Sequence, residues 1–150
     1  MVTGVDSSET ALRAARKAAE LAEGFGAELH VVTAYAANDS YSIETEGGSD
    51  GSSPAASSTT SDGLATNARS SADAVAAELR AAHPELTVVA SAGVGSPAEV
   101  LVGKAEALDA DLIVVGNKRV QGLARILGSV ARKVTAEAGC NVYIVNTVHR

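Results

Sequence analysis

Short aliphatic runs alternate with alanine-rich segments along this chain, and this alternation limits the folds that the chain can adopt. The runs are dominated by valine, isoleucine and leucine and cover residues 1–5, 28–35, 86–91, 111–116 and 141–147. Nearly continuous apolar runs of this length are typical of strands buried on both faces, as in a parallel sheet. The sequence therefore predicts an α/β domain, with a five-stranded, doubly wound parallel sheet covered by helices on both faces.

Four segments between or after these runs carry apolar residues at the helical spacing of three and four. The first has cap residues at 6–8 and a glycine stop at Gly24. The third begins with Ser96-Pro97-Ala98-Glu99, a capping box with proline at the first helical position. The fourth opens at Gly128-Ser129 and closes near Gly139. The four predicted stripes are Leu12, Ala15, Ala19 and Ala22; Leu64, Ala68, Ala72, Val75, Leu79 and Ala82; Leu101, Ala105 and Leu108; and Val130, Val134 and Ala138.

Residues 36–62 interrupt the alternation, because they are rich in serine, glycine, threonine and aspartate. Such a segment has too little apolar surface to pack, so we expect a flexible loop there. Three interpretations of this segment are open: a tolerated surface insertion, a lid over a ligand, or a segment for serine and threonine phosphorylation. The rest of residues 1–150 is expected to form a single domain.

Composition excludes several classes of protein. The net charge of −6 and the aromatic content of 3% argue against a nucleic-acid surface. The single cysteine, Cys140, excludes an internal disulfide framework, and the three histidines are too far apart to pair as metal ligands. No apolar run is long enough to cross a membrane, and the first residues lack a signal-peptide pattern. We therefore expect a cytoplasmic protein with no membrane or nucleic-acid partner and no metal site.

The residues that carry chemistry are expected at one crevice of the sheet. Ligands of open α/β sheets bind outside the carboxyl ends of the strands, where the strand order reverses. The first predicted strand ends at Gly4-Val5-Asp6, and the fourth ends at Val114-Val115-Gly116. Gly116 and Gly128 have no Cβ, so their backbone N–H groups are open to an anion. Ser129 is expected at a helix N-terminus, where a phosphate binds well.

Charged side chains support this hypothesis. Lys118, Arg119 and Arg125 bring positive charge to the segment between the two glycines in an otherwise acidic chain, and Asp6 is placed to accept hydrogen bonds from a ribose or a base. The alternative is structural: Gly116 as a strand-end turn and Gly128-Ser129 as a plain helix cap. A P-loop and a dinucleotide fingerprint are both excluded, because neither glycine spacing occurs.

Several segments together resemble the universal stress protein family. They are Val5-Asp6-Ser7-Ser8-Glu9, Gly95-Ser96-Pro97-Ala98-Glu99, the run from Ala110 to Asn117, Leu127-Gly128-Ser129-Val130 and Cys140-Asn141-Val142-Tyr143-Ile144-Val145. The resemblance spans the chain outside residues 36–62. It implies the strand order 3-2-1-4-5 and a homodimer formed through the last strand, residues 142–147. In one branch of the family it also implies adenine nucleotide binding, with Mg²⁺ if the nucleotide is ATP.

Carried over to this chain, the resemblance assigns the family's glycine motif to Gly116 and Gly128-Ser129, and places Ala34 and Val115 at the base. The predicted nucleotide-binding residues are Gly4, Val5, Asp6, Ala34, Val115, Gly116, Lys118, Arg119, Gly128, Ser129 and Val130. The second motif glycine is replaced by Arg119, only eight residues separate it from Gly128, and Ser7 stands where a glycine often follows the aspartate.

The sequence leaves three functions to distinguish. The first is a universal stress protein that binds ATP, AMP or cyclic AMP as a sensor or regulator in the stress response. The second is a dimeric interaction module of the same fold that does not bind nucleotide, which Arg119 favours. The third is an enzyme. We expect no catalytic residues and at most slow ATP hydrolysis, because the sequence supplies no positioned base and no carboxylate pair for Mg²⁺ beyond Asp6.

Overall fold

Five parallel strands form one sheet in the computed structural model, which describes residues 1–37, 55–117 and 127–147. The strands are β1 (Val2–Gly4), β2 (Leu29–Tyr35), β3 (Val88–Val94), β4 (Leu112–Asn117) and β5 (Asn141–Asn146). Their order is β3-β2-β1-β4-β5, and every neighbouring pair is parallel. The predicted α/β class and the strand order 3-2-1-4-5 are both confirmed.

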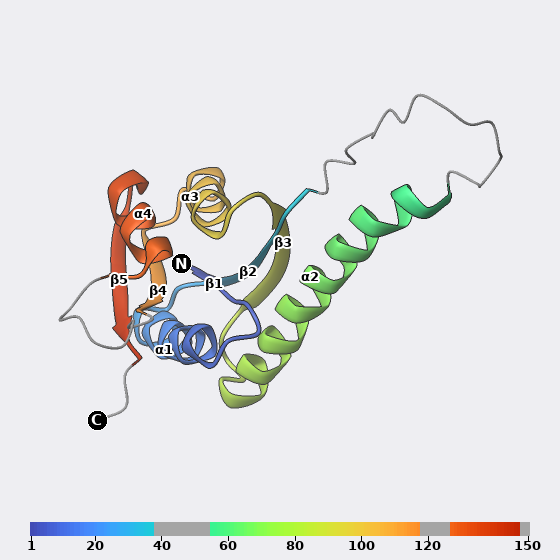
Figure 1. The fold of residues 1–150 in the computed structure, drawn as a ribbon. Coiled ribbons are helices and arrows are strands. Elements are labelled where there is room, and N and C mark those ends of the chain that lie inside the picture. Colours follow the sequence, from blue (N-terminus) through green and yellow to red (C-terminus); the bar gives the residue numbers. More distant parts are fainter. Residues whose placement is uncertain (38–54, 118–126, 148–150) are drawn as a thin grey trace, which may run out of the picture.

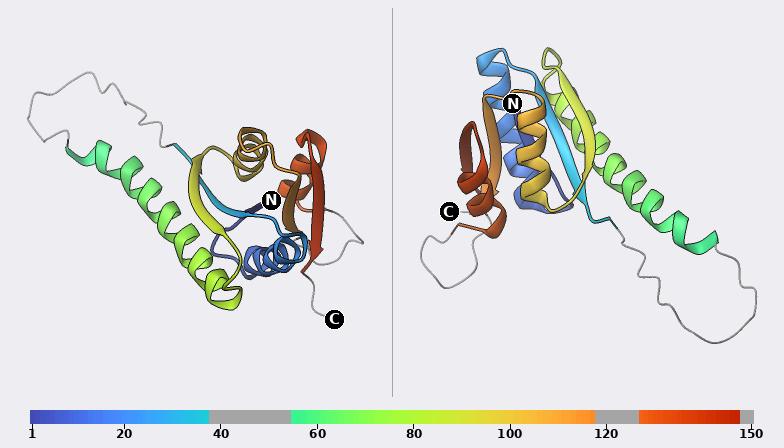
Figure 2. Two further views of the ribbon diagram at one scale, coloured as in Figure 1. Left: turned by 180° about the vertical axis from the view of Figure 1, so that it is seen from behind. Right: turned by 90° about the horizontal axis from the view of Figure 1, so that it is seen from above.

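Helices cover both faces of this sheet (Figures 1 and 2). α1 (Glu9–Phe25) and α2 (Ala55–Ala82) lie on one face, and α3 (Pro97–Ala107) and α4 (Ser129–Glu137) lie on the other. Each face has its own core. Alanines of α1 and α2 pack against Leu29, Val31 and Val114, whereas Val2, Val32 and Ile113 pack against α3 and α4. The small alanine side chains bring the helix axes close to the sheet, so a core with few aromatic residues still packs densely.

The topology creates one reversal of direction, at the centre of the sheet. From β1 the chain passes through α1 to β2, on one side of β1, whereas β4 pairs with its other side. The connections that leave the carboxyl ends of β1 and β4 therefore run to opposite faces of the sheet. This divergence leaves a crevice above the two strands, as the sequence analysis expected.

Several predicted boundaries are wrong. α1 ends at Gly26, which adopts the left-handed conformation (φ 61°) and whose N–H bonds to the carbonyl groups of residues 22 and 23, so Gly24 is not the stop. α2 begins at residue 55, so residues 55–62 of the predicted loop are helical; residues 38–54 lie outside the described part of the chain. β3 extends to Val94, three residues further than predicted.

The predicted helix stripes are mostly correct. Ala68, Ala72 and Leu79 of α2 are buried, as are Leu101, Ala105 and Val134 of α3 and α4. Leu108 and Ala82 are exposed: Leu108 is the C-cap residue of α3, and Ala82 is the last residue of α2. The capping box of α3 is confirmed: Ser96 Oγ accepts a hydrogen bond from the Glu99 N–H, and the Glu99 carboxylate accepts one from the Ser96 N–H.

Candidate functional site

A pocket of about 520 Å³ lies above the carboxyl ends of β1 and β4, in the crevice described above. Residues from three strands, three helix N-termini and the loop after β1 line it. They are Gly4, Val5, Asp6, Ser8, Thr10, Ala11, Val32, Ala34, Pro97, Val100, Leu101, Val115, Gly116, Gly128, Ser129, Val130 and Ala131. Its volume is in the range of small-molecule sites, and a mostly apolar lining with a few polar groups is typical of them.

The floor of the pocket is built by the central strands. Val5, at the end of β1, and Val115, on β4, are almost fully buried, and the Val5 N–H donates to the carbonyl of Val32 on β2. Below them, the Thr3 hydroxyl donates to the Val114 carbonyl, which links β1 to β4 on the buried side. The Thr3–Val114 bond fixes the separation of β1 and β4, whose ends define the site, and the Val5–Val32 bond holds the end of β1 to β2.

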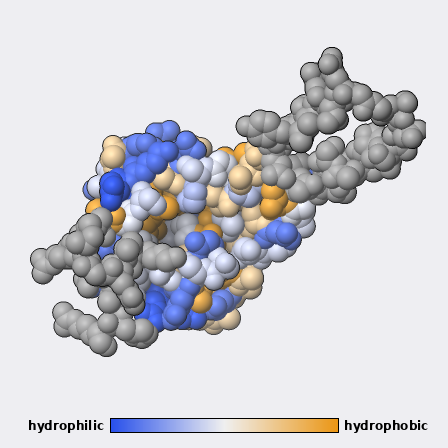
Figure 3. Space-filling model, in the orientation of Figure 1, coloured by the Kyte–Doolittle hydropathy of each residue, from blue (hydrophilic) through white to orange (hydrophobic). Residues whose placement is uncertain are grey.

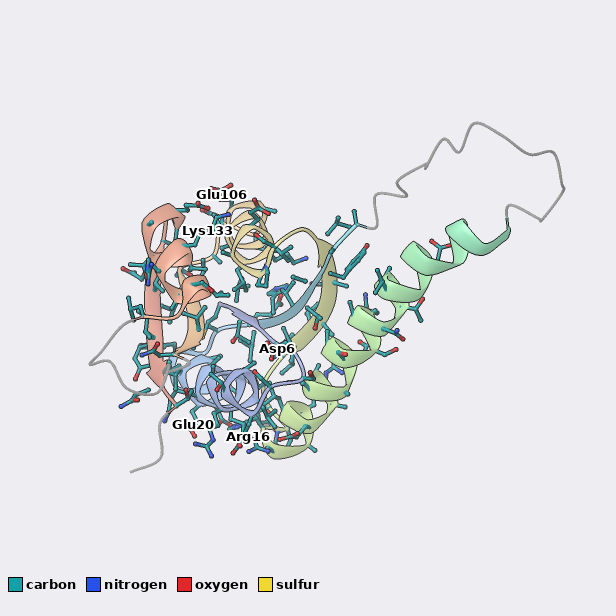
Figure 4. All side chains as sticks on the ribbon, viewed as in Figure 1. Asp6, Arg16, Glu20, Glu106 and Lys133 are labelled. Carbon is teal, nitrogen blue, oxygen red and sulfur yellow. The ribbon has the colours of Figure 1, made fainter. Side chains whose placement is uncertain are left out.

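Asp6 is the acidic group of the described lining. Figure 4 shows it on the connection between β1 and α1, whereas Arg16 and Glu20 lie on the outer surface of α1. Its Oδ1 accepts a hydrogen bond from the Ser8 N–H at 2.7 Å, and Ser8 Oγ in turn accepts one from the Ala11 N–H and so caps α1. The carboxylate is thus held in place by the turn that starts the helix, and its second oxygen can accept further hydrogen bonds.

Gly116 has a packing role in addition to the one the sequence suggested. A Cβ at this position would lie 2.8 Å from Thr10 Cγ2 and 2.9 Å from the Thr10 carbonyl oxygen. The glycine therefore makes room for the first turn of α1 and not only for an anion. The interpretation of Gly116 as open space for a phosphate is incomplete, because the space beside its Cα is filled by protein.

The N-terminus of α4 faces the pocket through Gly128, Ser129 and Val130. Gly128 is the N-cap residue, with φ −59° and no side chain to cap the helix. Its own N–H donates to Asn117 Oδ1 at 3.2 Å. The N–H groups of residues 129–131 precede the first bond of the helix, which the Arg132 N–H makes to the Gly128 carbonyl, and the helix dipole is positive at this end. This combination binds anions well.

The first turns of α3 form a wall that sequence analysis missed. Pro97, Val100 and Leu101 line the pocket opposite the loop after β1. Two glycines permit their approach: a Cβ at Gly4 would lie 3.0 Å from Leu101 Cδ1, and one at Gly93 would lie 2.6 Å from Val100 Cγ1. The capping box predicts where α3 begins in the sequence. That this beginning lies beside β1 follows from the strand order and not from the local sequence.

An ion pair joins this wall to α4. Lys133 Nζ lies 3.4 Å from Glu99 Oε1, and Figure 4 shows Lys133 beside α3. Hydrogen bonds from Ser96, with a smaller contribution from Lys133, lower the pKa of the Glu99 carboxyl, which keeps it ionised at neutral pH.

In Figure 3, hydrophilic side chains cover the outer surfaces around α3 and α4 at the top and around α1 at the bottom, with hydrophobic side chains between them.

Comparison with known proteins identifies the family. The model of the universal stress protein family matches residues 1–146. The chain belongs to the universal stress protein family. A curated universal stress protein of Mycobacterium tuberculosis is 30% identical over 148 residues, which cover 98% of this chain and 95% of that protein.

Solved universal stress proteins share the fold. One, in complex with cAMP, is 31% identical and superimposes with a TM-score of 0.65 over 98% of this chain and 96% of its own. Another, from Archaeoglobus fulgidus in complex with dAMP, is 26% identical and has a TM-score of 0.67 over 97% of this chain and 95% of its own. These two solved relatives are therefore complexes with adenine nucleotides that carry a single phosphate.

The structure brings most of the predicted site residues of this universal stress protein together. Nine of the eleven line the pocket: Gly4, Val5, Asp6, Ala34, Val115, Gly116, Gly128, Ser129 and Val130. Lys118 and Arg119 lie outside the described residues, as does Arg125. The roles of all eleven in binding stay predictions.

Two further findings concern other kinds of site. Among residues 1–37, 55–117 and 127–147, no three acidic, histidine or cysteine side chains come together as metal ligands, and no helix is long and apolar enough to span a membrane. Cys140 is half-buried, and burial, with the nearby Asp111 carboxylate, raises the pKa of its thiol. A thiol with a raised pKa is a weak nucleophile at neutral pH.

Proposed function

We propose that this universal stress protein binds an adenine nucleotide (ATP, AMP or cyclic AMP) in the pocket above β1 and β4, and acts as a sensor or regulator in the stress response. The observation that carries the proposal is the placement of the uncapped α4 N-terminus at one end of a largely apolar pocket of about 520 Å³. The solved relatives in complex with cAMP and dAMP support the choice of an adenine nucleotide.

The lining supports a separate place for each part of the ligand. A planar base fits the apolar side, between the valines of the sheet and the α3 wall, and leaves the backbone of Ala34 as a polar partner. Asp6, fixed by Ser8, is placed to accept hydrogen bonds from ribose hydroxyl groups. The phosphate would then meet the N–H groups and hydroxyl at Ser129.

The helix N-termini around the pocket differ in their capacity for phosphate. α1 is capped by Ser8 and α3 by Ser96 and Glu99, and each has a glutamate in its first turn. α4 has neither a side-chain cap from Gly128 nor an acidic residue in its first turn. An anionic group is therefore accommodated best at α4.

Binding, and not catalysis, is the proposed activity. Asp6 is the one carboxylate in the described lining, and no histidine, cysteine or lysine joins it there. A Mg²⁺ ion that arrived with ATP would have Asp6 and the phosphates as ligands, which suits an ion that keeps several waters. Without a positioned base, ATP hydrolysis would be slow at most.

We also propose a homodimer formed through β5 (Asn141–Asn146), the strand that the sequence analysis expected at residues 142–147. The strand is an edge of the sheet, and Tyr143 on it is 43% exposed. The opposite edge is less open to pairing, because Arg80 of α2 donates from Nε and Nη2 to the Val88 carbonyl of β3. An open apolar edge strand favours pairing with a second copy.

A second candidate function is a dimeric interaction module that does not bind nucleotide. Its support is Arg119, which replaces a glycine of the family's motif. The guanidinium can contact a phosphate directly, or the larger residue can oppose the loop path that binding needs. Arg119→Gly separates the two: weaker nucleotide binding supports a phosphate contact, and stronger binding supports the steric effect.

A thermal-shift series tests the proposed function. The purified protein is heated with ATP, ADP, AMP and cyclic AMP, and with GTP as the control ligand, and its absorbance at 260 nm is measured before any addition. We expect a rise in Tm with at least one adenine nucleotide. Excess absorbance from co-purified nucleotide would support the same conclusion, since the chain has no tryptophan. No shift with any nucleotide, and no bound nucleotide, would favour the interaction module.

A further inference from the structure

Asn117 and Thr147 form a hydrogen-bonded connection to the N-terminus of α4 from outside the pocket. Asn117 is the last residue of β4, and Thr147 directly follows β5. Neither residue is part of the pocket lining. Their contacts nevertheless end at Gly128, the N-cap of the helix that we propose to bind the phosphate.

The first contact fixes the helix end to the sheet. Gly128 has no side chain, so it cannot cap its own helix, and instead its N–H donates to Asn117 Oδ1 at 3.2 Å. This bond spans eleven residues of sequence and is partly buried. Because it joins the end of β4 to the start of α4, it sets where the N–H groups that follow Gly128 lie relative to the pocket.

The second contact fixes Asn117 itself. The Thr147 hydroxyl donates to the Asn117 carbonyl oxygen at 2.6 Å, in the register where Asn117 pairs with Asn146 of β5. The Thr147 carbonyl in turn accepts a hydrogen bond from Arg13 Nη1 of α1 at 3.1 Å. Asn117, at the end of β4, is therefore held by Thr147, and Thr147 is held by Arg13 of α1. The side chain of Asn117 in turn bonds to the Gly128 N–H.

We propose that Asn117 and Thr147 are positioning residues for the phosphate: Asn117 holds the α4 N-terminus in place, and Thr147 holds Asn117. This inference rests on the proposed function, because it concerns the phosphate end of the same pocket. The base and ribose would bind among Val115 of β4, β1, β2 and α3, and neither Asn117 nor Thr147 lines that part of the pocket. The two residues therefore affect the binding of the phosphate and leave the binding of the nucleoside unchanged.

The test compares a nucleotide with its nucleoside. Asn117→Ala and Thr147→Val are titrated with adenosine and with whichever of ATP, AMP and cyclic AMP the wild type binds most tightly. Binding is followed by NMR, which measures weak as well as tight association. The loss of one partly buried hydrogen bond predicts a fall in nucleotide affinity of about fivefold for each variant. Adenosine affinity is expected to stay at the wild-type value.

Two control variants separate positioning from loss of structure. Thr147→Ser retains the hydroxyl and is expected to restore wild-type nucleotide affinity. Thr66→Val removes a threonine hydroxyl that bonds only within α2, to the Asp62 carbonyl, and is expected to change neither affinity. If Asn117→Ala does not fold by circular dichroism, Thr147→Val and its serine counterpart still provide the comparison.

The outcomes distinguish this inference from the proposed function. Selective loss of nucleotide affinity in the variants supports the positioning role. An equal fall in both affinities, or no change in either, would overturn it while leaving nucleotide binding established. If the wild type binds neither nucleotide nor adenosine, the proposed function fails, and this inference fails with it.

Discussion

Single residues around the pocket serve the fold and the proposed site at once, and Gly116 shows this most clearly. From the sequence, its lack of a side chain suggested room for an anion; in the structure, the room is taken by Thr10 of α1. Nothing in the local sequence signals this contact, since the two residues are far apart in the chain and meet only when α1 packs on β4. Sequence patterns therefore located the glycine correctly but gave an incomplete reason for it.

Gly116→Ala is predicted to destabilise the fold. The added Cβ would lie 2.9 Å from the Thr10 carbonyl oxygen, a backbone atom that moves only if α1 shifts. Overpacking of this kind costs about 1–3 kcal/mol. Urea unfolding followed by circular dichroism measures the change in the free energy of unfolding.

Gly103→Ala is the matched control. This glycine is exposed in the middle of α3, and a Cβ there would meet no atom within 4 Å. Replacing it should stabilise the protein by about 0.5–1 kcal/mol, through helix propensity alone. If Gly116→Ala were as well tolerated as Gly103→Ala, close packing of α1 against β4 would be contradicted.

At the scale of elements, helix ends were easier to anticipate than what they pack against. The capping box at Ser96 was readable because its signal lies within four residues. The wall that α3 contributes to the pocket was not, because it depends on the crossover that brings α3 beside β1. α2 shows the converse: its first two turns contain few apolar residues, so composition suggested a loop where the backbone is helical.

Ser96→Ala is predicted to lower the free energy of unfolding by about 1 kcal/mol, the usual value of an N-cap hydroxyl. Ser96 Oγ accepts from the Glu99 N–H and donates to the Glu99 carboxylate, so the substitution removes both contacts. Ser71→Ala, at an exposed position within α2, is the control and should be neutral or slightly stabilising. Chemical unfolding of both variants at pH 7 makes the comparison, and equal stabilities would contradict the capping role.

Glu99 adds a dependence on pH. Its pKa is lowered in the folded state, chiefly by hydrogen bonds from Ser96, so the ionised form stabilises the fold. This contribution is complete above the ordinary pKa of a glutamate carboxyl and is lost as the pH falls through the lowered pKa of the folded state. The difference in stability between the wild type and Glu99→Gln should therefore be present at pH 7 and shrink in strongly acidic solution.

Unfolding of the two proteins across the acidic range measures this difference. Glu106→Gln, in the last turn of the same helix, is the control, because a negative charge at that end does not favour the helix. A difference between the wild type and Glu99→Gln that stayed constant with pH would show that the charge of Glu99 does not contribute.

At the scale of the whole molecule, the aliphatic runs were sufficient for the class of the sheet, and the family resemblance supplied its strand order. Buried parallel strands are read from nearly continuous valine and isoleucine runs, and the reversal between β1 and β4 follows from the strand order. That reversal brought nine of the predicted residues to one pocket, although they come from distant parts of the chain.

The protein is predicted to be a dimer of 15.0 kDa chains in light scattering at micromolar concentration. Tyr143→Lys places a charge on the β5 edge and should shift the mass toward that of one chain. Phe25→Lys is the control, because Phe25 is 74% exposed at the end of α1 and is not part of β5, so its replacement should leave the mass unchanged. A wild-type mass of one chain would contradict pairing through β5.

Nucleotide binding at the α4 N-terminus is tested most directly by isothermal titration of ATP, AMP and cyclic AMP into the wild type and Gly128→Val. Gly128 has φ −59°, which valine adopts without strain, so the variant is expected to fold while its side chain occupies the phosphate end of the pocket. We expect one nucleotide bound per wild-type chain, and an affinity lowered by about tenfold or more in Gly128→Val, equivalent to about 1.4 kcal/mol. No heat of binding in the wild type, or equal affinity in the two proteins, would contradict this expectation.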